Sequence, residues 1–545
     1  MKILIVLLVL LVSSSMGQVT QQWVQRYNGS WNRSDLGKSV TVDKTGNVYV
    51  IGSTANGITT DVITIKYNTS GSMLWLQIYN GPGEDVDHGE AIKVDDAGNV
   101  YVTGSSRGLT SRVDYVTIKY DSNGILKWVQ RFDGTTSMHD YPTDIAIDNS
   151  GNVYVTGWSS NGALFDDFAT VKYNSEGILQ WVNRYNGPGS STDIARSIAV
   201  DLTGNIYVAG YSSNTITGDN YTVIKYSSSG DTLWVRSYNG PVNGVDNLNS
   251  MSIDMNSNVY VTGRSEGSNG IDTTFDLATI KYNAMGVLQW AQRYNGPANG
   301  NEEGFSIDVD NAGNVYATGS SKGFTTASDY LTIKYSSSTG DPQWVQRYSG
   351  IISGSINTAS SITIDIYGNV YITGHSGDNM PNQYDYATIR YNPDGNVQWI
   401  QRYNGPANGI DWVHSIAIDS VGNVYVTGES SGINSGMDIA TIKYSQTIGI
   451  HPISTEIPVE YTLQQNYPNP FNPVTNIIFS IPKKGIVKFT VFDAAGRETA
   501  VLFNGELSAG TYNYDFDASQ LASGIYFYRL EAGEFTQTKK MVLLK

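Results

Sequence analysis

The chain has 545 residues, a formal net charge of −16 and no cysteine. Its length allows two or more domains, and the acidic balance argues against nucleic acid as a partner, because no basic stripe is available to displace counterions from phosphate. The absence of cysteine excludes disulfide bonds and thiolate metal sites. Glycine (57 residues) and tyrosine (37 residues) are abundant, which suits many tight turns between β-strands.

The N-terminus has the features of a secretory signal. A short apolar run, Ile3–Val12, is followed by the small residues Ser15 and Gly17, so we expect residues 1–17 to be cleaved off before Gln18. The run is shorter than the roughly 20 residues that a transmembrane helix needs. No other apolar run approaches that length, so we expect no transmembrane segment in the mature chain.

A repeated segment dominates residues 18–446. It reads approximately D-x-x-G-N-V-Y-V-T-G, occurs eight times and recurs every 52 to 56 residues. A period of this size built from short strands indicates a β-propeller with one blade per copy. Each copy can be divided into four strands, as in 91–95, 99–104, 114–120 and 128–132. The asparagines of the eight copies are Asn47, Asn99, Asn152, Asn205, Asn258, Asn314, Asn369 and Asn423.

The Asp and Gly of this segment predict a tight turn between the first and second strands. The Asp side chain can accept hydrogen bonds from the backbone two residues on, and Gly can take the left-handed conformation of the turn. Ser257 replaces the Gly in the fifth copy, which should cost about 1 kcal/mol if the turn is kept.

The tryptophans of the fourth strands predict how the repeat closes. The first of eight, Trp23, precedes any first strand, and the last third strand, Ala440–Tyr444, has no Trp after it. We therefore expect the strand Trp23–Tyr27 to complete the last blade, which removes two exposed sheet edges. The predicted fold is all-β, an eight-bladed propeller closed by the N-terminal strand. Seven blades is the alternative if one copy is degenerate.

Two acidic positions recur in every copy or nearly so. One hypothesis is a ring of carboxylates that binds calcium. The other is that each Asp ties a loop to a backbone N–H, which we favour because no D-x-D-x-D cluster is present. We expect no metal site and no cofactor, with calcium as the alternative. The first series is Asp35, Asp87, Asp140, Asp193, Asp246, Glu302, Ile356 and Asp411; the second is Asp61, Asp114, Asp167, Asp219, Asp276, Asp329, Asp385 and Asp438.

Candidate functional residues are those that break the repeat. The residue after each T-G varies most usefully, and we expect these residues where the second strand meets the face with the longer loops, the usual place for function. They are Ser53, Ser105, Trp158, Tyr211, Arg264, Ser320, His375 and Glu429. The alternative is ordinary variation, since no motif fixes their geometry.

Trp158 and Tyr211 could stack on a sugar or peptide. Arg264 and Trp412 are further ligand-binding candidates, and we expect Trp412 in a nearby loop with His88, His139 and His414. His375 and Glu429 stand on adjacent copies and could act as acid and base.

Two family resemblances follow from these motifs. The stretches "GNVYVTG", "DYxTIKY" and "WxQRYNG" resemble the bacterial SBBP-type propeller repeat over about residues 22–446, a resemblance that implies a fold and no particular reaction. Residues 461–545 resemble the type A C-terminal sorting domain of type IX secretion, through "YTLQQNYPNPFNPVTNIIFSIP", "VFDAAGRE", "LSAGTYNYDFDASQLASGIYFYRL" and "TQTKKMVLLK". The second resemblance implies recognition by the type IX translocon, and a secreted protein or one on the outer surface of a Gram-negative bacterium.

The last 85 residues also have a strand pattern of their own. Residues 447–460 read as a linker, and the spacing of the strands after residue 461 predicts a small antiparallel, immunoglobulin-like sandwich. The expected strands are Ile477–Ile481, Val487–Phe492, Thr511–Phe516, Ile525–Glu531 and Lys540–Leu544.

No catalytic motif accompanies the repeat: there is no nucleophile elbow, H-E-x-x-H, Walker loop or dinucleotide fingerprint. Our leading hypothesis is a non-catalytic binding or structural module with a glycan or protein ligand. The alternative is an extracellular hydrolase or lyase acting on polysaccharide or peptide, with His375 and Glu429 at the channel mouth. A third hypothesis is an inert spacer in a surface layer.

Overall fold

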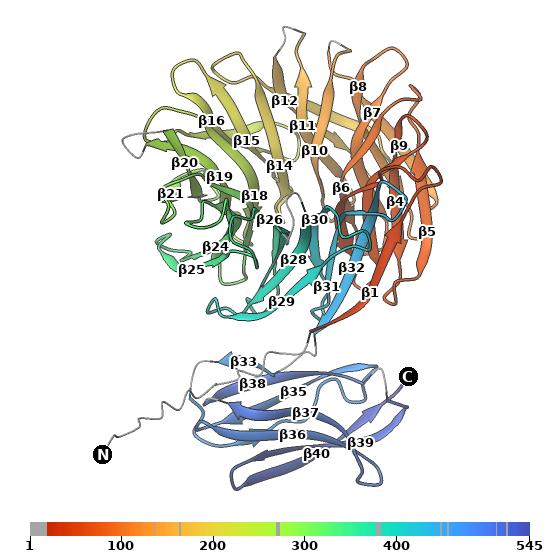
Figure 1. The fold of residues 1–545 in the computed structure, drawn as a ribbon, viewed down its shortest axis with the longest axis vertical. Coiled ribbons are helices and arrows are strands. Elements are labelled where there is room, and N and C mark those ends of the chain that lie inside the picture. The colour runs from red at the N-terminus through yellow and green to blue at the C-terminus, as the bar shows by residue number, and fades with distance from the viewer. Residues whose placement is uncertain are drawn as a thin grey trace, which may run out of the picture. The chain divides into compact units, whose positions relative to one another are not determined.

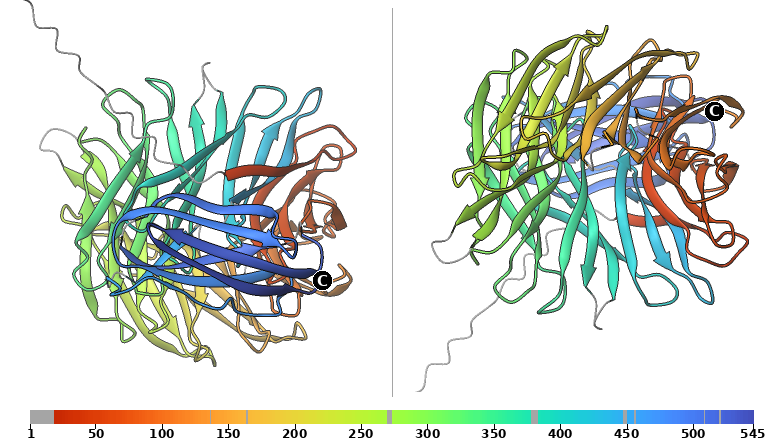
Figure 2. Two further views of the ribbon diagram at one scale, coloured as in Figure 1. Left: turned by 90° about the horizontal axis from the view of Figure 1, so that it is seen from below. Right: turned by 90° about the horizontal axis from the view of Figure 1, so that it is seen from above.

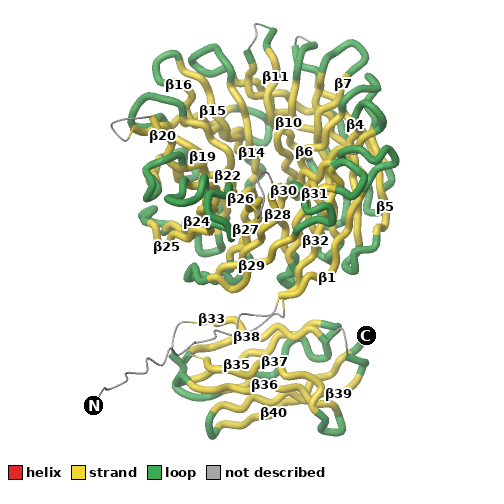
Figure 3. The backbone as a smooth tube through the Cα atoms, viewed as in Figure 1, coloured by secondary structure: helices red, strands yellow, loops and turns green. Residues whose placement is uncertain are grey.

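The computed structural model describes residues 19–135, 137–162, 165–268, 273–377, 383–446, 450–454, 457–507, 509–518 and 521–545. Over these ranges the regular elements are all β-strands (Figures 1 and 3). The chain divides into two compact units, Gln21–Ser445 and one that contains Gln446–Lys545. The expected signal peptide, residues 1–17, lies outside the described residues. Within the described part, no helix is long and apolar enough to cross a membrane.

The unit Gln21–Ser445, called the repeat unit below, contains all copies of the repeat. Its described residues form eight four-stranded sheets that follow one another around a common axis (Figure 2). The first four are β2 (Leu36–Val42), β3 (Val48–Ala55), β4 (Thr60–Tyr67) and β5 (Met73–Tyr79); β6 (Asp87–Val94), β7 (Val100–Arg107), β8 (Val113–Tyr120) and β9 (Leu126–Phe132); β10 (Asp140–Ile147), β11 (Val153–Ser160), β12 (Asp166–Tyr173) and β13 (Leu179–Tyr185); and β14 (Asp193–Val200), β15 (Ile206–Asn214), β16 (Gly218–Tyr226) and β17 (Thr232–Tyr238).

The other four sheets follow the same order, with one exception at the chain start. The last sheet has the order β1-β32-β31-β30, so the N-terminal strand takes the fourth position. The strands are β18 (Asp246–Ile253), β19 (Val259–Ser268), β20 (Thr273–Tyr282) and β21 (Leu288–Tyr294); β22 (Glu302–Val309), β23 (Val315–Ser321), β24 (Asp329–Tyr335) and β25 (Pro342–Tyr348); β26 (Asn357–Ile364), β27 (Val370–Gly377), β28 (Tyr384–Tyr391) and β29 (Val397–Tyr403); and β30 (Asp411–Ile418), β31 (Val424–Ser431), β32 (Met437–Gln446) and β1 (Val19–Tyr27).

Each fourth-strand tryptophan joins its sheet to the next one. The ring of Trp75 contacts Tyr49 of its own sheet and Tyr120 of the following sheet, at centroid distances of 6.2 and 6.1 Å. Its Nε1 donates to the carbonyl of Ser122 at 3.2 Å, and Lys66 Nζ donates to the same carbonyl at 2.9 Å. Aromatic packing and a shared acceptor therefore fix neighbouring sheets together.

The same device connects the last sheet to the first. Trp23 on β1 contacts Tyr425 of its own sheet and Tyr67 of the first sheet, both at 6.1 Å. Trp23 Nε1 and Lys443 Nζ both donate to the carbonyl of Thr69, at 3.2 and 3.0 Å. The lysines of the "TIKY" strands thus donate mainly to backbone carbonyls of the following sheet.

The turn between first and second strands has the predicted chemistry. Asp201 Oδ1 accepts from the N–H groups of Thr203 and Asn205, both at 2.9 Å, and its Oδ2 accepts from Asn205 Nδ2 at 2.9 Å and from the Tyr207 hydroxyl at 3.1 Å. Burial alone would raise the pKa of Asp201, but these hydrogen bonds outweigh it and lower the pKa to about 2. Ser257 keeps the turn with a left-handed φ of 61°.

Every first strand of the repeat contains a β-bulge at the same place. In β30 the pairing with β31 shifts between Val413 and Ser415, so His414 is the extra residue. The equivalent extra residues, defined here as the bulge ring, are Lys38, Glu90, Thr143, Arg196, Asn249, Phe305, Ser360 and His414. A bulge re-aims a side chain that regular pairing would direct elsewhere.

The C-terminal unit contains two four-stranded antiparallel sheets with the orders β33-β38-β35-β34 and β37-β36-β39-β40. Phe479 and Phe489, one from each sheet, meet at 5.5 Å within one buried cluster. The first strand of the unit, β33, lies within the expected linker and pairs with β38. The strands are β33 (Ile450–Ser454), β34 (Thr462–Leu463), β35 (Val474–Ile481), β36 (Gly485–Asp493), β37 (Glu498–Leu507), β38 (Gly510–Asp517), β39 (Gly524–Ala532) and β40 (Phe535–Leu543).

Candidate functional site

The bulge ring lines one cavity. All eight of its members border a space of about 610 Å³, together with Thr358, His375, Trp412 and Val413. We call it the axial cavity, since first strands from all eight sheets contribute to it. The ring holds eight different residue types, whereas the residue after the bulge is Ser in six of eight copies. Variation inside a constant frame is what a binding site on a rigid scaffold requires.

One wall of the axial cavity gathers aromatic and titratable side chains from β27, β30 and β31. His375 lies 6.0 Å from the ring of Trp412, which is 40% exposed. His414 Nε2 contacts Glu429 Oε2 at 2.9 Å. Burial and the nearby charge of His414 lower the pKa of His375 to about 4, so that this imidazole is neutral at neutral pH.

The other wall is charged. Lys38 and Glu90 form an ion pair at 3.3 Å. The guanidinium of Arg196 lies 5.6 Å from the ring centroid of Tyr211. Asn249 Nδ2 donates to Glu303 Oε1 at 2.9 Å. The cavity therefore offers flat aromatic faces on one side and cationic and polar groups on the other, a combination typical of small-ligand sites.

The structure brings together only part of the predicted site. His375 and Trp412 line the axial cavity, and His414 connects Glu429 to the same wall. Trp412 and His414 lie on strand β30 and His88 lies on β6, so our expectation that these residues lie in loops was wrong. The bulge interrupts the alternation of apolar residues by which we recognised first strands, so the residues before the bulge were not recognised as part of β30.

The remaining three candidates do not themselves line the cavity. Trp158 packs on Tyr141, its cross-strand neighbour, at 4.5 Å. Tyr211 lies under Arg196. Arg264 donates to Asn247 Oδ1 and pairs with Glu303 at 3.6 Å. These residues pack within and between sheets at the positions where the sequence placed them, but they do not border the cavity.

The first acidic series ties loops to the sheets. Asp193 Oδ2 accepts from the N–H of Gly187 at 2.7 Å, and its Oδ1 accepts from the N–H of Ser213 at 3.1 Å. Burial raises the pKa of Asp193, against the effect of these hydrogen bonds. In the seventh copy Asn357 takes this position, one residue later than the spacing predicted, and accepts from Ser376.

The second acidic series forms ion pairs with fourth-strand arginines in six sheets, at distances from 2.6 to 3.4 Å: Arg26–Asp438, Arg131–Asp114, Arg184–Asp167, Arg293–Asp276, Arg347–Asp329 and Arg402–Asp385. Between the second and third sheets Asp133 joins both series, and carboxylate oxygens of Asp114, Asp133 and Asp140 lie within 4.8 Å of one another. Arg131, 2.6 Å from Asp114, already supplies a positive charge to this cluster.

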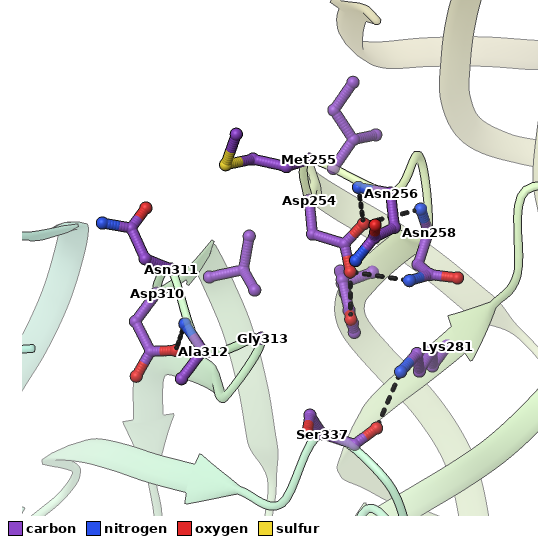
Figure 4. A pocket seen from close by; sticks show the side chains of 13 residues that line it. Asp254, Met255, Asn256, Asn258, Lys281, Asp310, Asn311, Ala312, Gly313 and Ser337 are labelled. Atoms are coloured by element: carbon purple, nitrogen blue, oxygen red, sulfur yellow. Dashed lines mark hydrogen bonds between the residues drawn. The ribbon is translucent and has the colours of Figure 1, made fainter.

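A second hollow lies between two sheets, at the turns that follow Asp254 and Asp310 (Figure 4). It measures about 290 Å³ and is bordered by Asp254, Asn258, Lys281 and Asp310. Asp254 is occupied by hydrogen bonds from the N–H of Asn258 and its Nδ2, at 2.9 and 2.7 Å. A matching hollow borders Asp148 and Asp201. Because the hollow recurs between other sheets and its carboxylate already accepts hydrogen bonds, we interpret it as a consequence of the turn structure and not as a ligand site.

Asp308 on β22 gives the repeat unit a pH dependence. Its burial raises its pKa to about 6, with Asp310 adding to the shift, although the N–H groups of Val309 and Ile364 and the Ser252 hydroxyl donate to it. The native state therefore holds more protons than the unfolded state between about pH 4 and 6, and stability falls as the pH rises through that range.

We accordingly expect Asp308→Asn to increase the free energy of unfolding by about 2 kcal/mol at pH 7 and to have little effect at pH 4. Urea unfolding at the two pH values measures this, with the exposed turn variant Asp341→Asn as control. An equal effect of Asp308→Asn at both pH values would contradict the raised pKa.

Comparisons with known proteins bear on both units. The family model described as "Beta-propeller repeat" matches residues 22–61, 127–166, 180–216, 343–379 and 398–434. The model described as "Secretion system C-terminal sorting domain" matches residues 465–544. The chain carries beta-propeller repeats and a type IX sorting domain. The sorting domain implies export through that secretion system, and both sequence resemblances are confirmed.

Individual proteins add less than the family models. An uncharacterized WD repeat-containing protein of Acanthamoeba polyphaga mimivirus is 26% identical over 380 residues, 57% of this chain, and the chain spans about a quarter of that relative's length. Among solved structures, PorZ, a surface component of the type IX secretion system of Porphyromonas gingivalis, has 13% identity and a TM-score of 0.39, covering 93% of this chain and 70% of its own. A fungal alcohol oxidase in complex with copper has 11% identity and a TM-score of 0.38, covering 97% of this chain and all of its own. At such TM-scores these likenesses say nothing about activity.

Proposed function

We propose that this protein is a non-catalytic binding module on the outside of a Gram-negative bacterium, and that its ligand, a glycan, occupies the axial cavity. The repeats form one closed eight-bladed propeller, and the sorting domain is an immunoglobulin-like sandwich that the type IX translocon reads. The strand order of the last sheet and the contacts of Trp23 with both neighbours support the closure.

The observation that carries the proposal is the bulge ring. Eight equivalent positions border one cavity and carry eight different residues, followed in six of the eight copies by a serine. The turn hollows, in contrast, share the Asp, Asn and Lys residues that border them. The exposed face of Trp412, with His375 beside it, suits the apolar face of a sugar ring. The proposed function needs no metal.

Filling the cavity tests the site. Ser360→Trp adds a large side chain to the bulge ring. We expect it to weaken glycan binding at least about 30-fold while the fold is retained, because the new side chain occupies the cavity volume that the ligand needs. Glycan-array screening of the wild type, followed by calorimetric titration of a hit, measures this.

The matched control is Asn311→Trp, which fills the turn hollow and should leave binding unchanged. Unaltered affinity in Ser360→Trp, or equal loss in both variants, would exclude the axial cavity as the site. Absence of any glycan hit would overturn the proposed ligand.

One observation favours a second function, an extracellular hydrolase or lyase: His414 contacts Glu429 at 2.9 Å beside the neutral His375. A histidine oriented by a carboxylate is a common general base. If the wild type cleaves a polysaccharide or peptide, His414→Ala should lower kcat by about 100-fold or more. The double variant His375→Ala, Glu429→Ala should do likewise. Turnover that survives both changes would remove these residues from any catalytic role.

A further inference from the structure

We infer that the ligand of the axial cavity is an anionic sugar, bound through its carboxylate or sulfate by Arg196. This inference rests on the proposed function and names the chemistry of its ligand. It starts from an arginine whose surroundings differ from those of the arginines in the sheets.

Arg196 is the bulged residue of β14, exposed to the cavity that it borders. The six fourth-strand arginines described above are each neutralised by a buried or half-buried aspartate. Arg196 has no such carboxylate: within the described residues it forms no ion pair, and its guanidinium rests on the ring of Tyr211 at 5.6 Å. A cation–π contact orients the guanidinium without neutralising its charge, so its donors remain available for an incoming anion.

The other charges around the cavity are already paired. Lys38 is matched by Glu90 on the next sheet at 3.3 Å, and Glu429 is engaged by His414. Glu303 accepts from Asn249 and pairs with Arg264. Among the lining residues, the cations Lys38 and Arg196 and the carboxylate Glu90 sum to a formal charge of +1, in a chain of net charge −16. The unbalanced charge belongs to Arg196.

The opposite wall selects the rest of the ligand. Phe305, His375 and Trp412 border the same cavity, and Trp412 keeps 40% of its surface exposed. Flat apolar faces pack against the C–H face of a pyranose ring, and a cavity of about 610 Å³ lies within the range that holds small ligands. Arginine binds planar oxyanions through two parallel hydrogen bonds. A sugar ring that carries an anionic substituent satisfies both walls at once.

The test compares charged and uncharged forms of one sugar. The mature chain is titrated with trigalacturonate, with its methyl ester, which keeps the rings and removes the charge, and with a sulfated galactan oligosaccharide. We expect an anionic probe to bind more tightly than the methyl ester. Arg196→Gln should lower the affinity for that probe about 10- to 100-fold, the range for losing a hydrogen bond to a charged group, and leave the methyl ester unaffected.

Arg33→Gln, a loop arginine outside the cavity lining, is the matched control and should change nothing. Binding of carboxylated but not sulfated sugar, or the reverse, identifies the anion. Equal affinity for trigalacturonate and its methyl ester, or full affinity in Arg196→Gln, would overturn the inference while Ser360→Trp could still support the glycan site. If none of the three sugars binds, the inference fails; the array screen and Ser360→Trp then decide the proposed function separately.

Discussion

Replacement of Arg26 by isoleucine is expected to lower the free energy of unfolding of the repeat unit by about 3–5 kcal/mol, the cost of leaving a buried charge without its partner. Arg26 lies on the N-terminal strand β1. Its Nη2 reaches Asp438 Oδ2 at 2.7 Å and the carbonyls of Ser430 and Ser431 at 2.9 and 3.0 Å, while its Nη1 donates to the Tyr403 hydroxyl at 2.9 Å. One side chain thus joins β1 to the next two strands of the last sheet, β32 and β31, and to the preceding sheet.

The size of the effect follows from what remains around Asp438. Its side chain is 8% exposed, and with Arg26 removed the hydroxyl of Ser435 is left as a donor at 2.9 Å. The first sheet lacks the equivalent arginine, and its aspartate has a different hydrogen-bond donor. Ile78 takes the position in the first sheet, where Asn56 donates to Asp61 and burial raises the pKa of that carboxyl. The last sheet has no such substitute.

Urea unfolding of the full chain measures the effect as a midpoint lowered by about 1 M or more. Adding Asp438→Asn to Arg26→Ile should recover part of the loss, since the stranded charge is gone. Lys44→Ala is the control: it breaks an exposed pair with Asp96, whose side chains are 75% and 81% accessible, and should cost less than about 1 kcal/mol. A loss in Arg26→Ile as small as that of the control would argue that β1 does not close the last sheet.

The sequence predicted those features of the repeat that depend on local chemistry. Asp and Gly in the turn, and Trp at the fourth strand, each act through neighbours at fixed spacing, so a repeated pattern is enough to recognise them. The strand order β1-β32-β31-β30 agrees with the position of Trp23. The reading of the first acidic series as loop ties was also within reach, because short polar side chains usually bond nearby backbone.

The site was predicted only in part because it depends on register. His375 and Trp412 were recognised since they break the repeat, but the bulge ring was missed. An extra residue in one strand inverts the faces of the residues before it, and periodicity alone does not reveal this. A signal was present: one position holds eight different residues next to a Ser that recurs in six copies. Trp158 shows the converse, since its variation is absorbed by the cross-strand partner Tyr141.

Substitution of Gly428 by alanine is expected to destabilise the repeat unit by about 3 kcal/mol, at the upper end of overpacking costs. Gly428 is the glycine of the last T-G and lies opposite the bulge of β30. A Cβ there would lie 2.0 Å from the carbonyl oxygen of Trp412 and 2.7 Å from Cα of Val413, both backbone atoms. Its φ is not left-handed, so the glycine is required for space and not for backbone conformation.

All eight glycines at this repeat position share this contact: a Cβ at Gly52, Gly104, Gly157, Gly210, Gly263, Gly319, Gly374 or Gly428 would lie between 1.9 and 2.1 Å from a first-strand carbonyl. The most regular part of the repeat therefore makes room for the bulge, and the bulge aims the variable residue into the cavity. Gly428→Ala should therefore lower stability and also move the cavity-lining residues Trp412 and His414, because both lie on β30.

Thermal unfolding and glycan titration together test the Gly428→Ala prediction. The control is the adjacent change Thr427→Ala, which the chain already contains at the equivalent Ala209; it removes hydrogen bonds to the Ala440 carbonyl at 3.4 Å and to the Thr441 hydroxyl at 3.0 Å and should cost about 1–2 kcal/mol. Gly428→Ala should lower the melting temperature more than this control does and weaken binding in the axial cavity. A Gly428→Ala protein that is as stable as the control would mean that β30 can move away from β31 at little cost. The bulges would then be incidental to the eight residues that they present, and the link between the repeat and the cavity would be lost.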